Sequence, residues 1–408
     1  MNKFPRSAYV HIPFCHRRCF YCDFAVIPLG NKVETLKGYG SKTVQEYLQF
    51  LYKEILSIKH KSPLSTIYIG GGTPSILDPA QIKKLVDLFK ENYGIDYGAE
   101  ITMEVDPASF TQDDLFGFIN AGINRFSLGV QSFNNQILQK SGRRHLREDA
   151  EKSCLWLKRE FDSGLIKSWS LDLIQNLPLS GFKEWQDDLK KAITFSPPHI
   201  SIYDLNIENG TVFKKLVNLG KLELPSDELA FRNSESTHLV LKYSGYSRYE
   251  ISNYCLPTHQ SRHNRVYWSG FGWWSFGQGS TSSPWGEKLT RPRVSKKYKE
   301  WVIRQCERNL DSSLTNKDFV YKELDEKIML GLRLKEGVDI KELFKEQNCL
   351  ITWTIEGFDE YSSQDLCPDS KDAWYVGSID LVERLNQIDY EFEQSQQIQL
   401  IMEVSTSN

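Results

Sequence analysis

Six short segments rich in β-branched and aromatic residues recur in the first half of the chain, and helix-like stretches separate them. The segments are SAYVHI at 7–12, STIYIG at 65–70, AEITMEV at 99–105, NRFSLGV at 124–130, SWSLDLI at 168–174 and HISIYDL at 199–205. The stretch at 79–94 between two of them places apolar residues at helical spacing and ends on Gly94, which can cap a helix. Strands that alternate with helices are typical of βαβ units. The sequence therefore predicts an α/β fold with a parallel sheet.

Polar or glycine-rich residues follow each of these six segments directly. They are CHRRCFYC, GGTPS, Glu104 with Asp106, Gln131 with Ser132, Asp172 with Gln175, and Asp204 with Asn206. In a parallel barrel the C-terminal ends of the strands form one face, where catalytic residues from different strands meet. We therefore expect one site assembled from six strands, although polar residues also follow strands simply because turns need them.

Composition narrows the functional classes. The 408 residues include 50 Lys and Arg against 53 Asp and Glu, a formal charge of -3, which gives no electrostatic reason to expect nucleic-acid binding. We find no apolar run near the roughly 20 residues that a spanning helix needs. The N-terminus lacks the apolar core and cleavage site of a secretory signal, so a cytoplasmic location is expected. The length predicts two or three domains.

Three of the eight cysteines, Cys15, Cys19 and Cys22, form a C-x3-C-x2-C cluster, and the other five share no spacing that suggests a disulfide framework. Three thiolates on one loop indicate zinc or an iron-sulfur cluster. Zinc would need a fourth ligand such as His11 or His16, because no later Cys-x2-Cys or His-x3-His pair completes the site. A cubane cluster with three thiolates would leave one iron open to a substrate.

A C-x3-C-x2-C cluster on the loop after the first strand resembles the signature of radical S-adenosylmethionine proteins. The resemblance implies a 4Fe-4S cluster held by Cys15, Cys19 and Cys22, with S-adenosylmethionine bound at the open iron and cleaved to a 5'-deoxyadenosyl radical. The glycine-rich motif at 70–75 lacks the Gly-Lys-Ser/Thr of a phosphate-binding loop. It resembles the GGTP motif of the same family, which contacts the methionyl end of S-adenosylmethionine.

The motifs YVHIPFC, CDF, GGGTPS, EVDP, SLGVQSF, LDLI, YEISN and RHNRVYW resemble, in order, those of coproporphyrinogen dehydrogenase-like proteins over almost the whole chain. The resemblance implies S-adenosylmethionine contacts at Tyr9, Tyr21, Gly71, Gly72, Thr73, Glu104, Gln131, Arg143, Asp172 and Asp204. Glu104 and Asp172 could accept hydrogen bonds from the ribose hydroxyls or the ammonium, and Arg143 could pair with the methionyl carboxylate. Alternatively, Arg143 is a solvated surface cation and Asp172 caps a strand end.

Two branches of this family differ after the third cysteine. The oxygen-independent coproporphyrinogen III oxidases carry a further cysteine two residues on, where this chain has Phe24, and the CDF ending is similar to the heme-chaperone branch. That branch binds heme and delivers it to acceptor hemoproteins, and its H-N-x-x-Y-W segment implies a heme ligand at His263, near Tyr267 and Trp268. Alternatively, His263 is a hydrogen-bonded fold residue and the two aromatic residues belong to the core.

The resemblance implies a partial (β/α)6 barrel of the TIM type over 1–235. An extension over 236–317, with the H-N-x-x-Y-W segment, would cover the barrel face, and a small helical, winged-helix-like domain would occupy 318–408. The rival function is oxidative decarboxylation of coproporphyrinogen III propionates, an oxidoreductase reaction of porphyrin biosynthesis. An electron donor for the cluster is expected as a partner, and peripheral membrane contact stays open. Two departures from the family's motifs put the transfer of its function to this chain in doubt. Gln175-Asn176 replaces the family's Tyr-Gly pair, and the stretch at 279–282 lacks the family's histidine.

Overall fold

The computed structural model describes residues 5–30, 41–58, 62–307, 330–331 and 333–337, and the backbone of 350–351 and 404–405. The chain divides into two compact units. The first comprises Met1–Arg248, Ser252–Tyr267 and Phe271–Tyr321, and the second comprises Tyr249–Ile251, Trp268–Gly270 and Lys322–Asn408.

The first unit is built on a parallel sheet, and all six predicted strands are confirmed. They are β1 (Ser7–Ile12), β4 (Leu64–Gly71), β5 (Ile95–Val105), β6 (Arg125–Gln131), β7 (Ser168–Gln175) and β8 (His199–Asp204), and they pair in this order. The whole nine-stranded sheet has the order β11-β1-β4-β5-β6-β7-β8-β10-β9. Its added strands are β9 (Ser247–Glu250), β10 (Asn253–Cys255) and β11 (Trp274–Phe276). The first and last of the six strands, β1 and β8, pair with β11 and β10 rather than with each other. The six strands therefore form the predicted partial barrel and not a closed one.

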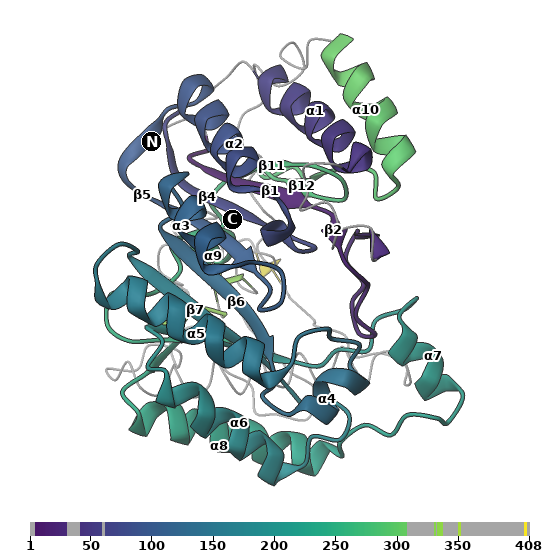
Figure 1. Ribbon diagram of the computed structural model, residues 1–408, viewed down its shortest axis with the longest axis vertical. Coiled ribbons are helices and arrows are strands. Elements are labelled where there is room, and N and C mark those ends of the chain that lie inside the picture. The colour runs from purple at the N-terminus through teal and green to yellow at the C-terminus, as the bar shows by residue number, and fades with distance from the viewer. Residues whose placement is uncertain are drawn as a thin grey trace. The chain divides into compact units, whose positions relative to one another are not determined.

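Helices follow the parallel strands and form a layer along the sheet (Figure 1). They are α1 (Lys42–Ser57), α2 (Pro79–Asn92), α3 (Gln112–Asn120), α5 (Arg147–Asp162) and α6 (Phe182–Thr194). In α2 the capping box of Asp78 and Gln81 starts the helix, and Gly94 follows its end in the left-handed region at φ 79°. The apolar face expected from the sequence is buried, through Ile82, Leu85, Val86 and Phe89.

The alternation of side chains along the strands separates the core from the site. Residues on one face pack against the helices and are apolar and buried, such as Val10, Ile67, Met103, Phe126 and Leu171. Their neighbours in sequence point to the other face, because successive side chains of a strand alternate. These neighbours include Tyr9, Tyr68, Glu104, Ser127 and Asp172, so polar groups from five strands share the inner face.

Short elements gather where the parallel strands end: β2 (Phe14–Cys15), β3 (Ile27–Pro28), the 3-10 turn η2 (Pro74–Ile76), α4 (Asn135–Lys140) and α7 (Val212–Asn218). In Figure 1 β2, α4 and α7 all lie on the right-hand side of the sheet, with β2 above the two helices. The remaining elements are α8 (Asp227–Tyr243), α9 (Arg262–Trp268), β12 (Thr281–Ser282), β13 (Leu289–Thr290) and α10 (Ser295–Glu307). Helix α8 packs on α6 and α10 on α1. The boundary predicted at residue 235 falls inside α8.

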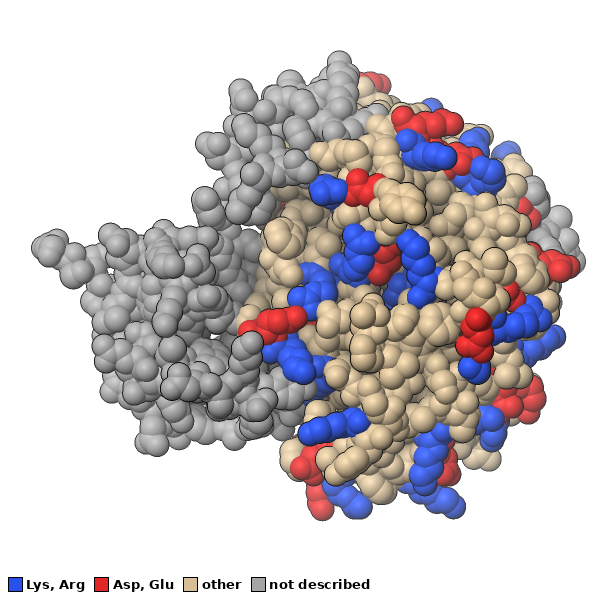
Figure 2. Space-filling model, turned by 90° about the vertical axis from the view of Figure 1, so that its left-hand side faces the viewer, with Lys and Arg blue, Asp and Glu red and all other residues tan. Residues whose placement is uncertain are grey.

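The described part of the second unit is small. Arg333 lies over the ring of Trp268 at 4.3 Å, the Lys335 amide donates to the Tyr249 carbonyl, and β14 (Leu350–Ile351) pairs with β15 (Val404–Ser405). The winged-helix-like domain predicted over 318–408 lies largely outside the described residues and stays a prediction. No helix in the described ranges is both long and apolar enough to span a membrane. Figure 2 shows Lys and Arg interspersed with Asp and Glu on one face, in keeping with the near-neutral composition.

Candidate functional site

The cysteine loop connects β2 to β3 at the C-terminal end of β1. Cys15, Cys19 and Cys22 all carry free thiols and are half-buried. The loop lies at the end of the sheet where the polar strand ends were expected to meet.

Contacts with α4 and α7 hold this loop in place. The Phe20 amide donates to the Ser141 carbonyl at 3.0 Å, and the Phe213 amide donates to the Phe20 carbonyl at 3.0 Å. Arg17 Nε donates to the Gly142 carbonyl at 2.7 Å. Gly142 has φ 78°, and a Cβ there would lie 2.8 Å from the Phe20 ring, so only glycine allows this approach. The loop is thus built against elements more than 100 residues away in the chain.

One residue from the turn after β4 and one from the loop after α4 reach two of the thiols. Thr73 Oγ1 donates to Cys15 Sγ at 3.5 Å, and Arg143 Nη1 donates to Cys19 Sγ at 3.6 Å. A Cβ on Gly72 would lie 2.9 Å from Cys15 Sγ, so the glycine lets the turn after β4 approach the loop. Of the predicted contacts, Gly72, Thr73 and Arg143 are therefore placed beside the predicted metal ligands.

The donor set fits an iron-sulfur cluster. Burial raises the pKa of the Cys15 thiol to about 12, with only partial relief from the Thr73 hydrogen bond, and burial also raises the pKa of Cys22. Thiolates buried in this way need a cation, which cluster iron would supply. No three His, Cys, Asp or Glu side chains of the described residues group closely enough to hold one metal ion. Three thiols that bind three different irons need not converge on one point, as ligands of a single zinc must.

Glu104 lies at the end of β5 and is held by β4. Tyr68 Oη donates to Glu104 Oε1 and the Gly71 amide donates to Oε2, both at 2.9 Å. Burial raises the pKa of Glu104 to about 7, although these two hydrogen bonds counteract it. Tyr9 stacks on Tyr68 with ring centroids 6.0 Å apart. Tyr9, Gly71 and Glu104 thus form one connected group on the inner face.

Arg143 is no solvated surface cation, since its side chain is only 11% exposed and forms an ion pair with Asp106. It also donates to the Gly129 carbonyl at 2.7 Å. Burial alone would raise the pKa of Asp106, but Arg143 brings it below its usual value. The sequence indicates Asp106 among the polar strand-end residues of the expected site but assigns it no ligand contact. Gln131 ends β6 in the left-handed region at φ 67°, close to Gly129.

Asp172 lies within β7 rather than at its end, so it does not cap the strand. It accepts hydrogen bonds from Ser127 Oγ at 2.7 Å and Ser170 Oγ at 2.6 Å. Burial raises its pKa, and these hydroxyls counteract the rise. The two serines were not predicted. Ser127 lies two residues before Gly129, and Ser170 lies two residues before Asp172, so both serines are on the inner face. This spacing could have indicated them as site residues.

The departing pair Gln175-Asn176 contacts Asp204. Gln175 Nε2 and Asn176 Nδ2 donate to Asp204 Oδ1 at 2.6 and 2.7 Å. Asn176 has φ 63°, a conformation that asparagine tolerates better than most residues. These two amides therefore fix the Asp204 carboxylate at the end of β8.

Tyr21 belongs to the cysteine loop itself. Its ring packs against Phe213 of α7, with ring centroids 6.3 Å apart. Burial and then the charge of the neighbouring Cys19 raise the pKa of Tyr21, whereas Arg143 counteracts the rise. The Tyr21 hydroxyl is thus grouped with Cys19 and Arg143 rather than with Glu104.

His263 lies near the opposite, N-terminal ends of the strands and is fully buried. Its Nδ1 is 2.8 Å from Thr66 Oγ1, its Nε2 is 2.9 Å from Tyr267 Oη, and its amide donates to Glu100 at 3.0 Å. Burial and then the charge of Arg125 lower its pKa to about 3. Heme ligation by His263 would require one of the two ring hydrogen bonds to break, and it stays a prediction.

The comparisons identify relatives along most of the chain. Residues 9–171 match the Radical SAM superfamily. The protein named heme chaperone HemW from Synechocystis sp. is 40% identical over 346 residues, which cover 83% of this chain and 80% of that protein. The protein of the same name from Bacillus subtilis is 33% identical, over 84% of this chain and 86% of that protein. The one from Escherichia coli is 31% identical, over 91% of this chain and 94% of that protein. The solved coproporphyrinogen III oxidase HemN from Escherichia coli has a TM-score of 0.67 at 24% identity, with 85% of this chain and 80% of that chain covered, which shows a shared fold.

Proposed function

Because this chain belongs to the HemW family of radical S-adenosylmethionine proteins, we propose that it binds heme and delivers it to acceptor hemoproteins. The observation that carries the proposal is the 40% identity to a protein named as a heme chaperone, over 83% of this chain. The C-x3-C-x2-C loop and the inner-face residues from Tyr9 to Ser127 lie within the aligned superfamily region, which ends one residue before Asp172. The proposal includes a cytoplasmic location.

The cofactors of this proposal are a 4Fe-4S cluster and S-adenosylmethionine. Cys15, Cys19 and Cys22 would hold the cluster, which when bound supplies one-electron chemistry through S-adenosylmethionine. Arg143 donates to the Cys19 sulfur and would offset the negative charge of the thiolates. Glu104 would accept hydrogen bonds from the ligand.

The rival function, oxidation of coproporphyrinogen III, is not favoured. The similarity to HemN is 24% in sequence and supports the fold alone. Phe24 occupies the position where those oxidases are expected to carry a further cysteine, and its side chain is 57% exposed beside the cysteine loop. A thiol is therefore missing at the place where the resemblance to the oxidases required it.

An anaerobic heme titration of the cluster-reconstituted protein tests the proposal. We expect saturable one-to-one binding in the Soret band, followed by transfer of the heme to an apo-hemoprotein such as apomyoglobin. An absence of heme binding would contradict the proposal. Formation of protoporphyrinogen from coproporphyrinogen III, with reductant and S-adenosylmethionine, would support the oxidase instead.

A further inference from the structure

A pocket of about 360 Å³ lies beside the cysteine loop, at the edge of the sheet where β11 pairs with β1. Four segments of the first unit line it: β1, the end of the cysteine loop, α9 and the stretch from Trp273 to Arg293. Its volume is within the range of small-molecule sites. Phe24 lies in its wall, two residues after Cys22, so a ligand in this pocket would sit next to the cysteine loop.

The lining combines aromatic rings with hydroxyl groups, an arginine and an aspartate. Phe24, Tyr267 and Trp273 contribute rings, and Tyr267 meets Trp273 edge to face with centroids 4.9 Å apart. Thr281 contributes a hydroxyl, and Arg293 contributes a guanidinium whose Nη2 donates to the Asp23 carbonyl and lies 3.8 Å from the Asp23 carboxylate, which also lines the pocket. The rings suit a flat apolar ring system. A carboxylate on that ring system would pair with the guanidinium in competition with the partly exposed Asp23 carboxylate.

His263 lies behind this pocket rather than in its wall. Its Nε2 is 2.9 Å from Tyr267 Oη, and its ring is perpendicular to the Tyr267 ring at 5.1 Å. On its other side Nδ1 is bound to Thr66, and Tyr68 stacks on the imidazole at 5.3 Å. These contacts fix the imidazole, and the imidazole in turn fixes the orientation of Tyr267.

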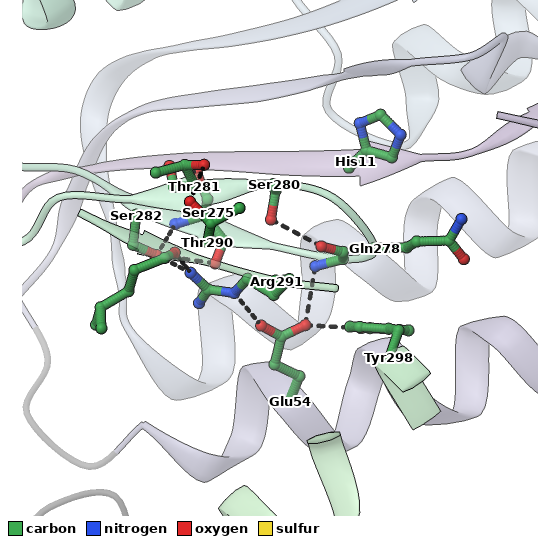
Figure 3. Close-up of polar contacts among 12 residues, drawn as sticks. His11, Glu54, Ser275, Gln278, Ser280, Thr281, Ser282, Thr290, Arg291 and Tyr298 are labelled. Carbon is green, nitrogen blue, oxygen red and sulfur yellow. Dashed lines mark hydrogen bonds and ion pairs between the residues drawn. The ribbon is translucent and has the colours of Figure 1, made fainter. Parts of the chain in front are cut away.

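The wall from residue 277 to 293 is anchored to α1 and α10 by a buried ion pair (Figure 3). Glu54 Oε1 accepts from Arg291 Nε at 2.8 Å, and Oε2 accepts from Tyr298 Oη at 2.7 Å and from the Gly277 amide at 2.8 Å. Arg291 also donates to Ser282 Oγ at 2.5 Å. The wall is therefore fixed before any ligand arrives, which lowers the entropic cost of binding.

We propose that this pocket binds one edge of the heme, with a propionate on Arg293 and the ring against Phe24 and Trp273, and that His263 is a positioning residue that acts through Tyr267. This inference rests on the proposed function, because heme is the flat dicarboxylate that function requires. It places the cargo in the pocket beside the cysteine loop, where Tyr267 separates it from His263, whereas ligation by His263 would bring the iron to the imidazole itself.

Heme titrations of the cluster-reconstituted protein test the location. Arg293→Ser and Phe24→Ser each change an exposed side chain of the pocket, so the fold should survive. The matched controls, Arg304→Ser and Phe271→Ser, change exposed residues outside the pocket lining. Each pocket variant should raise the Kd for heme by about tenfold, the loss typical of a main binding contact, and the controls should bind like the wild type.

The outcomes separate this inference from the proposed function. If the wild type binds no heme, the proposed function fails. If the wild type binds heme and both pocket variants bind it equally tightly, only the location is overturned.

The role of His263 is tested by the spectrum of the bound heme. As a positioning residue, His263→Gln should weaken binding but leave the Soret maximum and the electron paramagnetic resonance g values unchanged, and Tyr267→Phe should do the same to a smaller extent. A spectral change in His263→Gln that Tyr267→Phe does not share would show that the imidazole ligates the iron, and would overturn the positioning role.

Discussion

Single cysteines decide whether a cluster can assemble, because each thiol of the loop would hold a different iron. Replacing Cys19 by Ala removes one ligand and leaves Arg143 without its sulfur acceptor. We expect anaerobic reconstitution of this variant to give no visible cluster absorbance. Cys306→Ala, which changes an exposed thiol outside the loop, should reconstitute normally. Full iron and sulfide content in Cys19→Ala would contradict the cluster assignment.

Glu104 should make ligand binding sensitive to pH near neutrality. Its pKa, raised by burial to about 7, lies above the ordinary value, so the carboxyl is mostly protonated below that pH and mostly ionised above it. The ionised carboxylate accepts hydrogen bonds from S-adenosylmethionine better than the protonated carboxyl does. S-adenosylmethionine should therefore bind about tenfold more tightly at about pH 8 than at about pH 6.

Isothermal titration calorimetry on the reconstituted protein measures this dependence. Glu104→Gln should bind more weakly and lose the dependence, because an amide does not ionise in this range. A wild-type affinity that stays constant across the interval would refute the role of Glu104.

At the scale of elements, the turn after β4 must approach the cysteine loop closely. In Gly72→Ala the new Cβ would lie 2.9 Å from Cys15 Sγ and 2.7 Å from the Phe14 carbonyl oxygen, so the loop or the turn must shift. We expect this variant to fold but to take up less iron and sulfide than the wild type.

The matched control for that variant is Gly98→Ala. Gly98 has φ 80° but nothing within 4 Å of its added Cβ, so its substitution strains the backbone without touching the loop. Iron content should be normal in this control. Equal iron and sulfide contents in the two variants would show that the close approach of the turn is not needed for cluster assembly.

At the scale of the whole molecule, the ion pair between Glu54 and Arg291 joins α1 to a segment 237 residues later in the chain. Their side chains are 1% and 4% exposed. Glu54→Gln should cost about 3–5 kcal/mol, because it leaves a buried guanidinium without its counter-charge. Glu46→Gln, which breaks an exposed contact of α1 with Lys299, should cost less than about 1 kcal/mol.

Thermal unfolding followed by circular dichroism compares the two variants. The midpoint of Glu54→Gln should fall well below those of Glu46→Gln and the wild type. Equal midpoints would mean that the buried pair does not anchor the pocket wall.

The sequence alone was sufficient to predict the order and type of the main elements. Strand alternation and helical spacing are local properties, and they identified β1, β4, β5, β6, β7, β8 and α2. The cysteine spacing is also local and indicated thiolate ligation. Parallel strands bring their C-terminal ends to one edge, so the approach of the turn at Thr73 to the cysteine loop followed from the fold class, whereas Arg143 was expected there only from the family resemblance.

Only the tertiary structure decided which side chains meet. Arg143 pairs with Asp106 across 37 residues, and His263 bonds to Thr66 across 197. No periodicity encodes such pairs, because they depend on how separate segments pack. His263, which the sequence predicted as a heme ligand, is hydrogen-bonded to Tyr267, and Tyr267 rather than His263 lines the nearby pocket. Four segments form that pocket, and only the fold brings them together.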